Sequence, residues 1–144
     1  MARVEKSVLV AHTPERMFEL VDRVEDYPDF LPWCGGTELK LRDEHCTVAT
    51  IHIAYMGVHQ SFTTENAKTP PREMRIKLQH GPFSELEGDW VFSPLGDDAC
   101  KIEFRLQYVF SSRVLETLLA PVFSHIANSF VDAFVRRADE VYAL

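Results

Sequence analysis

The stretch that decides the fold lies near the end of the chain, at residues 112–142, and reads SRVLETLLAPVFSHIANSFVDAFVRRADEVY. Apolar residues recur in it at steps of three, four or seven, which is the repeat of an amphipathic helix. The main stripe is formed by Leu115, Leu118, Leu119, Val122, Ile126, Phe130, Phe134 and Val141, and Phe123, Ala127, Val131 and Val135 widen it. This broad apolar arc predicts a long terminal helix that contacts a sheet with one part and faces a cavity with another.

The ends of this helix can be predicted from residues that satisfy or break backbone hydrogen bonds. Ser111 or Ser112 can cap the first turn, because a serine oxygen accepts a bond from a free backbone N–H. Pro121 has no N–H to donate to the carbonyl of Thr117, and its ring crowds that turn. The sequence therefore predicts either a kinked helix or a short helix followed by a second one that starts near Pro121.

Composition limits the class of protein. A chain of 144 residues, 46% of them hydrophobic, has the size of one domain, which we expect to span residues 1–144. The 22 acidic and 15 basic residues give a net charge of −7, which disfavours generic nucleic-acid binding because it repels phosphates. We find neither a secretory signal nor an unbroken apolar span, so we expect a soluble cytoplasmic protein. Three cysteines without metal-like spacing indicate buried thiols in a reducing compartment.

The first forty residues predict a strand, a short helix and a stiff connection. Val4, Val8 and Val10 indicate the strand, and Thr13 followed by Pro14 is typical of a helix start. The segment Tyr27–Cys34, with the sequence YPDFLPWC, places prolines among large apolar side chains. That pattern favours a stiff apolar connection over a solvated loop.

Between residues 37 and 110 the apolar period is two, which predicts about six antiparallel strands. Met56-Gly57 indicates a two-residue hairpin turn that pairs Tyr55 with Val58. This register would place Ile51, Ile53, Tyr55, Val58, Gln60 and Phe62 on one face, and His52, Ala54, His59 and Ser61 on the other. A strict two-residue turn at Gly81-Pro82 would set Leu78 opposite Glu85, so we expect a longer loop or a bulge there.

Together these elements predict an α+β fold in which a long terminal helix covers the apolar face of a sheet. If the sheet curves, helix and sheet enclose a pocket. Gly88 lies between Leu86, Trp90 and Phe92 on the expected inner face. Its missing side chain either relieves packing or leaves room for a ligand.

Three segments carry a family resemblance: YPDFLPWC at 27–34, GPFSELEGDWVF at 81–92 and the Phe-rich terminal helix. They resemble the coenzyme Q-binding branch of the START-like (polyketide cyclase/dehydrase and lipid transport) superfamily, which also contains the RatA-type ribosome association toxins of bacteria. The resemblance covers almost the whole chain. It implies a helix-grip fold, in which a curved antiparallel sheet of about seven strands surrounds a long C-terminal helix and leaves an apolar cavity.

The resemblance implies a non-catalytic function that binds ubiquinone or a related polyprenyl lipid and supports respiration as a carrier or chaperone near the inner membrane. Such a ligand is bound and is not a catalytic cofactor. The alternative that it implies is a toxin that acts on the large ribosomal subunit, and a polyketide cyclase or dehydrase is a third hypothesis. A quinone needs a long dry pocket with a few polar groups near its mouth.

The candidate cavity residues are Trp33, Tyr55, Gln60, Leu86, Trp90, Phe92, Phe123, Ile126 and Phe130, with Tyr55 and Gln60 as hydrogen-bonding groups. We expect Tyr27, Phe30 and Leu31 in the stiff segment to form the entrance, where Trp33 suits a site that is apolar on one side and wet on the other. For any single one of these residues, an ordinary place in the core is the favoured interpretation.

The alternatives depend on charged and titratable residues. For the ribosome, Lys68, Arg72, Arg75 and Lys77 concentrate positive charge before and along one strand, and Arg136 and Arg137 add more. For an enzyme, His52 and His59 are expected to point outward and have no carboxylate or cysteine partner at matching spacing, and His125 lies beside the apolar helix stripe. No nucleophile motif, phosphate loop or metal constellation is evident, so we interpret the chain as non-enzymatic.

Overall fold

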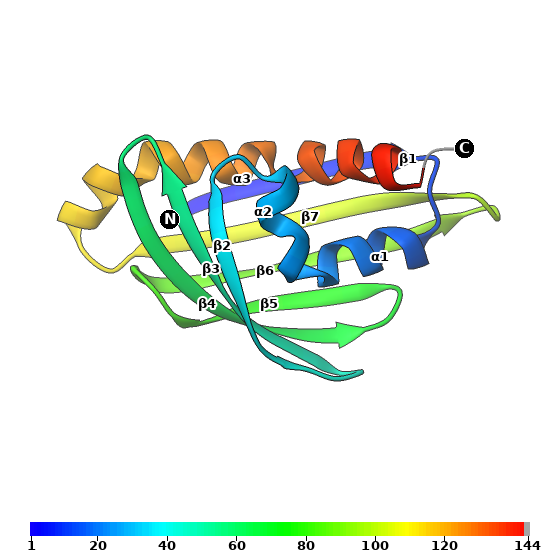
Figure 1. Cartoon of the computed structure of the whole chain (residues 1–144), viewed down its shortest axis with the longest axis horizontal. Helices are drawn as coiled ribbons and strands as arrows, with labels where there is room; N and C mark the ends of the chain where they lie inside the picture. Colours follow the sequence, from blue (N-terminus) through cyan, green and yellow to red (C-terminus); the bar gives the residue numbers. More distant parts are fainter. Residues whose placement is uncertain (143–144) are drawn as a thin grey trace.

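The computed structural model describes residues 1–142 as a seven-stranded sheet with one long helix (Figure 1). The strands are β1 (Ala2–Val10), β2 (Cys34–Arg42), β3 (Cys46–Tyr55), β4 (Val58–Thr69), β5 (Glu73–His80), β6 (Phe83–Leu95) and β7 (Ala99–Phe110). The helices are α1 (Pro14–Asp22), a 3₁₀ turn η1 (Val24–Asp26), α2 (Tyr27–Phe30) and α3 (Arg113–Val141). This α+β architecture agrees with the predicted helix-grip fold.

All strands pair with antiparallel neighbours in the order β1-β7-β6-β5-β4-β3-β2. The order follows the chain except that β1 joins the far edge beside β7. Figure 1 shows α3 lying along the sheet, while β2, β3 and β4 curve around one end of the molecule. Helix α1 contacts both α3 and β6, so the segment between β1 and β2 closes the space between helix and sheet.

The predicted helix caps are confirmed. Ser112 Oγ accepts a hydrogen bond from the backbone N–H of Leu115 at 3.2 Å, and Thr13 Oγ1 accepts one from Arg16 at the same distance. Helix α3 runs without interruption through Pro121, so the alternative of two separate helices is wrong. Pro121 lies on the exposed side of α3, where water can replace the bond that proline cannot donate.

The β3–β4 hairpin has the predicted register. Tyr55 pairs with Val58, and the ladder continues through Ile53 with Gln60 and Ile51 with Phe62. Met56 and Gly57 have φ values of 51° and 78°, and positive φ at both central residues is the requirement of a type I′ turn. Because the turn fixes the register, the two faces of this hairpin contain the residues that the sequence assigned to them.

The predicted irregularity near Gly81-Pro82 is also confirmed. The β5–β6 ladder ends at Lys77 opposite Glu87, a register that a strict two-residue turn would not give. Bulges lie in the neighbouring ladders, one in β5 where Thr63 and Thr64 pair with His80 and Leu78, and one between Phe83 and Glu85 of β6. The β5–β6 register sets Met74 opposite Trp90 and Ile76 opposite Gly88, so the apolar side chains of the two strands share one face.

Gly88 is required for packing between strands. A Cβ atom at this position would lie 2.2 Å from the Arg105 carbonyl oxygen and 3.1 Å from Leu106 Cα. Both atoms belong to the backbone of β7 and cannot move aside while the strands stay paired. Close approach of β6 and β7 therefore explains Gly88, and the space it leaves is taken by β7.

The buried side of α3 differs from the predicted stripe at both ends of the helix. Its buried residues are Leu119, Phe123, Ile126, Ala127, Val131, Ala133, Phe134 and Ala138. Leu118 and Val141, which belong to the predicted stripe, are 62% and 48% exposed. Helical periodicity identifies a face but not how far a sheet covers it. By length and mean hydropathy α3 resembles a membrane span, as core helices often do.

Candidate ligand cavity and its polar end

A cavity of about 70 Å³ lies between α3 and the inner face of the sheet. Its lining is apolar except for a few side chains and comprises Val21, Val24, Tyr27, Trp33, Ile51, Phe62, Thr64, Asn66, Met74, Ile76, Leu86, Trp90, Phe104, Leu106, Phe123, Ile126, Ala127 and Phe130. An engineered cavity of roughly 150 Å³ admits benzene, so a ring-sized ligand would have to displace lining side chains.

Phe130 is the aromatic residue most able to change the size of this cavity. It is half-buried, whereas Trp90 beside it is 1% exposed. Its ring centroid lies 5.8 Å from that of Trp90, 5.7 Å from Phe104 and 6.0 Å from Trp33. The rings meet at tilted angles, a favourable arrangement that presents both faces and edges to the cavity.

Two polar side chains of β4, Thr64 and Asn66, lie on the cavity wall. Asn66 is 7% exposed, and its Oδ1 atom has no hydrogen-bond partner among the described residues. An unsatisfied buried polar group costs roughly 1–3 kcal/mol of stability. Asn66 is therefore the group on the wall that would gain most from a polar ligand atom.

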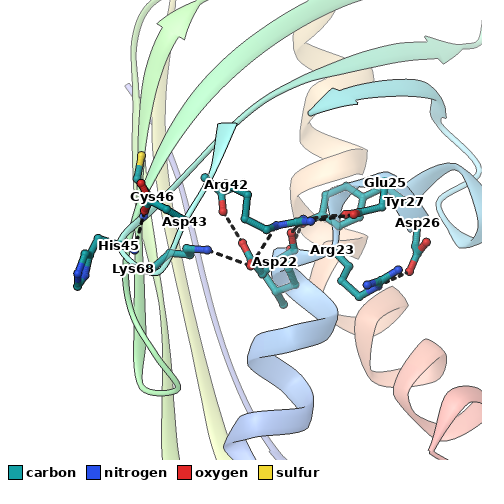
Figure 2. Close-up of polar contacts among 12 residues, drawn as sticks. Asp22, Arg23, Glu25, Asp26, Tyr27, Arg42, Asp43, His45, Cys46 and Lys68 are labelled. Carbon is teal, nitrogen blue, oxygen red and sulfur yellow. Dashed lines mark hydrogen bonds and ion pairs between the residues drawn. The ribbon is translucent and has the colours of Figure 1, made fainter. Parts of the chain in front are cut away.

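Beyond Asn66, the same face of β4 ends in a buried ion pair at the end of α1. Lys68 Nζ lies 3.1 Å from Asp22 Oδ2, and the Lys68 side chain is only 4% exposed. Thr47 donates from its hydroxyl to Asp22 Oδ1 at 2.7 Å. Figure 2 shows the side chains of Lys68 and Arg42 pointing toward Asp22 from separate strands. The inner face of β4 thus changes from apolar at Phe62 to charged at Lys68.

Arg42 of β2 extends this network to η1. It donates two hydrogen bonds to the Glu25 carboxylate, at 2.8 and 2.7 Å, and a third to the Asp22 backbone carbonyl at 2.6 Å (Figure 2). The hydrogen bonds from Arg42 lower the pKa of Glu25 from 4.5 to about 2. We call Asp22, Glu25, Arg42, Thr47 and Lys68 the clasp, because they fasten the α1–η1 segment to β2, β3 and β4.

The predicted entrance segment is packed closely over the cavity. Tyr27 is 3% exposed and donates from its hydroxyl to the Val21 carbonyl, and burial raises the pKa of that hydroxyl well above its usual range. Leu31 is 1% exposed. Phe30 is half-buried, and the Arg137 guanidinium lies 5.2 Å from the centre of its ring. This cation–π contact joins α2 to the end of α3.

The structure brings seven of the predicted site residues to the cavity and leaves five away from its lining. Tyr27, Trp33, Leu86, Trp90, Phe123, Ile126 and Phe130 line it, whereas Phe30, Leu31, Tyr55, Gln60 and Phe92 do not. Phe92 contacts Phe18 of α1, and Tyr55 stacks on His125 at 5.5 Å. Gln60 borders a small void near the hairpin. Alternation places these residues on the inner face but cannot show which part of that face borders the cavity.

His52 and His59 lie on the surface side of the sheet, as predicted, whereas His12 is 6% exposed and contacts Asp139 of α3. The sequence shows no carboxylate at matching spacing for His52, but the fold supplies one, because its Nε2 lies 2.9 Å from Glu38 Oε2 and its Nδ1 lies 2.5 Å from Ser61 Oγ. The three residues come from adjacent strands, a proximity that spacing along the chain does not reveal. Within residues 1–142, no three His, Cys, Asp or Glu side chains are placed to hold a metal ion.

Only some of the cations in the predicted basic patch lie on the surface of the protein. Lys68 is buried in the clasp and contributes nothing to the surface. Arg72, Arg75 and Lys77 are exposed, and Arg75 pairs with Glu73 at 2.6 Å. Arg75 and Lys77 border a hollow of about 540 Å³ on the outer face of the sheet. This hollow is lined by both acidic and basic side chains, and its other charged residues are Arg3, Glu5, Glu87, Asp89 and Arg105.

These features define the class of this protein. A seven-stranded antiparallel sheet around a long C-terminal helix, with a cavity between them, is the START-like helix-grip architecture. The aromatase/cyclase Zhui from Streptomyces sp. R1128 has the same fold, with a TM-score of 0.83 over 96% of this chain and 93% of that chain at 17% identity.

The chain belongs to the polyketide cyclase/dehydrase and lipid transport family, whose model matches residues 10–135. Within it, the chain is 40% identical over 142 residues to the ribosome association toxin RatA of Vibrio cholerae, with 99% of each chain covered. It is 26% identical over 141 residues to the mitochondrial coenzyme Q-binding protein COQ10 homolog B of Xenopus laevis, covering 95% of this chain and 58% of that protein. These similarities confirm the predicted branch of the superfamily.

Proposed function

We propose that this protein is a non-catalytic, cytoplasmic ribosome association factor that binds the large ribosomal subunit. The observation that carries this proposal is the 40% identity to the RatA toxin of Vibrio cholerae over 99% of both chains. Identity spread over the full length of two chains of equal size favours a shared partner more than a shared fold does. Ribosome association, the alternative that the sequence predicts, is therefore the stronger hypothesis.

The surface that fits this partner best is the outer face of β5. Arg75 and Lys77 are exposed there and border the outer hollow, and Arg72 is exposed in the turn before the strand. The net charge of −7 repels RNA at long range, so a local group of cations has to supply the phosphate contacts. The inner residues of β5 are occupied by the cavity, which leaves only the outer face for a macromolecule.

The test is sedimentation of the purified protein with separated ribosomal subunits in a sucrose gradient. We expect it to migrate with the large subunit, and we expect Arg75→Glu with Lys77→Glu to reduce the bound fraction. The matched control, Lys40→Glu with Arg113→Glu, makes the same change of charge at exposed positions outside the predicted basic patch. If the protein stays at the top of the gradient with either subunit, the proposal is wrong.

A second function, binding of a small hydrophobic molecule, is favoured by the apolar cavity and its unpartnered Asn66. Ubiquinone or a related polyprenyl lipid remains the predicted ligand, and the similarity to a coenzyme Q-binding protein supports it. The experiment is organic extraction of protein purified from its own host, followed by mass spectrometry. Near-stoichiometric quinone would support this function, and its absence from protein that migrates with ribosomes would leave the first function alone.

A further inference from the structure

The amide of Asn66 is a polar group built into an apolar wall without a protein partner for its oxygen. The residue is only 7% exposed, and its Oδ1 atom is buried without a hydrogen bond. Two other polar residues lie on the same face of β4. Thr64 carries only a single hydroxyl group, and the ammonium of Lys68 is already paired with Asp22. Asn66 therefore retains hydrogen-bonding capacity at the cavity surface.

Asn66 is also held in a fixed position. The β3–β4 ladder is continuous from Tyr55 with Val58 to Cys46 with Ala67, and it pairs Asn66 with Thr47. On its other side, Asn66 pairs with Ile76 of β5, which also lines the cavity. Because both neighbouring strands fix its backbone, the amide cannot reach water by a movement of a loop.

The rest of the lining indicates what kind of molecule would meet this amide. Trp33, Trp90, Phe104 and Phe130 present ring faces and edges to the cavity, which suits a planar aromatic ring. The Tyr27 hydroxyl donates to the Val21 carbonyl and is already committed as a donor. A lone water needs two to four polar partners, and this wall offers few.

We propose that Asn66 is the anchor for the hydroxyl group of a small aromatic ligand bound between α3 and β4. A ring hydroxyl donates to Oδ1 and can accept from Nδ2, so it satisfies both atoms of the amide. A ring carbonyl only accepts and leaves Oδ1 without a partner. The site therefore prefers a phenol or a hydroquinone to the corresponding carbonyl compound. This inference rests on the second proposed function, binding in the cavity, and not on ribosome association.

The volume of about 70 Å³ is too small for the ring of the ligand, so Phe130 turns aside to admit that ring. Phe130 is half-buried, so its movement costs less than movement of the fully enclosed Trp90 or Phe104. The ring then occupies the place between Trp90 and β4, and its hydroxyl lies against Asn66.

The experiment compares phenol with toluene, which has the same shape and lacks the hydroxyl, and hydroquinone with benzoquinone, on the full chain. Ligand binding is followed by the indole N–H signals of Trp33 and Trp90 in ¹⁵N-resolved NMR spectra, because both residues line the cavity and both are present in the parent and in Asn66→Leu. We expect phenol to bind several-fold more tightly than toluene, and hydroquinone more tightly than benzoquinone. In Asn66→Leu both preferences should fall by roughly three- to tenfold, the effect of one hydrogen bond.

Stability separates an anchor from a structural residue. Asn66→Leu should unfold at an equal or higher temperature than the parent, because it removes an unsatisfied amide from an apolar site. The control is Thr63→Val on the opposite face of β4, where the Thr63 hydroxyl is bonded to Thr50 at 2.6 Å. That variant should lose stability and keep both ring preferences. A loss of stability in Asn66→Leu would overturn the assignment.

The remaining outcomes are distinct. Ring binding with the same preferences in Asn66→Leu would overturn the anchor and leave binding in the cavity intact; the amide would then hold only a water. No ring binding by the parent protein would overturn both the anchor and the second proposed function. Neither result depends on whether the protein migrates with ribosomes, so the first proposed function is tested separately.

Discussion

The Asp22–Lys68 pair gives a quantitative test of what the clasp contributes to stability. The charged atoms lie 3.1 Å apart, and the side chains of Asp22 and Lys68 are 15% and 4% exposed. Removing one partner of a buried pair costs roughly 3–5 kcal/mol, because the other charge stays buried without compensation. In Asp22→Asn the Lys68 ammonium loses the ion pair that holds it. We therefore expect Asp22→Asn to lower the free energy of unfolding by the full amount of roughly 3–5 kcal/mol.

Lys68→Met should cost less, about 2–3 kcal/mol, because Asp22 has other partners. Thr47 still donates to Asp22 Oδ1 at 2.7 Å, and Arg42 Nε lies 3.5 Å from Oδ2. Methionine also replaces most of the apolar length of the lysine side chain. The order of the two losses therefore follows from the number of partners that each charge retains.

The assay is urea denaturation of the parent, both single variants and the double variant, followed by circular dichroism. We expect the double variant to lose less than the sum of the single variants, by about 1–2 kcal/mol. The control is the exposed pair Arg75 and Glu73, whose variants should show no measurable coupling. Additive losses for Asp22 and Lys68, or a larger loss in Lys68→Met than in Asp22→Asn, would refute the reasoning.

Three further predictions concern the sheet, the clasp and the aromatic cluster. Gly88→Ala should lose about 3 kcal/mol of stability or fail to fold, because its Cβ would lie 2.2 Å from the Arg105 carbonyl oxygen. The control is Gly36→Ala, where the nearest contact of the added Cβ is 3.6 Å, and it should change stability by less than about 0.5 kcal/mol in the same urea denaturation assay. The folded-state pKa of Glu25, about 2, lies below its ordinary 4.5, so its contribution to stability is present above pH 4.5 and is lost as the pH falls toward 2. The melting temperatures of the parent and Glu25→Gln should therefore differ at pH 6 and converge near pH 2.5, and a constant difference would contradict the assignment. Phe130→Ala should cost about 3 kcal/mol by urea denaturation and enlarge the cavity, whereas an unchanged stability would show that its aromatic contacts are weak.

Features that depend on local chemistry could be predicted from the sequence. The Ser112 and Thr13 caps and the Met56-Gly57 turn need only the residues within one turn of the chain. The mismatch at Gly81-Pro82 was visible because period two makes a shift of one residue reverse the face of every side chain. The position of the cavity along the sheet depends on curvature and on how α3 lies, so alternation placed Tyr55 and Phe92 on the correct face without excluding them from the lining.

The inward position of Asn66 could have been predicted from its spacing in the sequence, although its polarity suggests the opposite. Because Thr64, Asn66 and Lys68 are hydrophilic, residue type alone predicts that they are exposed to solvent. Their spacing from Phe62 is two, four and six, and an uninterrupted strand therefore places all of them on its inner face. The pairing with α1 that buries Lys68 joins residues 46 positions apart, which no local pattern reveals. Polar residues in phase with a buried aromatic residue are thus candidates for a site.

Strand β5 connects the two proposed functions and also lets them be separated. Its residues alternate, so Met74 and Ile76 line the cavity while Arg75 and Lys77 border the outer hollow. A substitution at an odd-numbered position changes the outer surface and leaves the cavity wall in place. Charge reversal at Arg75 and Lys77 should therefore weaken migration with ribosomes and preserve ring binding, and Asn66→Leu should do the reverse. If one substitution abolished both activities in a folded protein, cavity and outer face would have to be coupled through β5 itself.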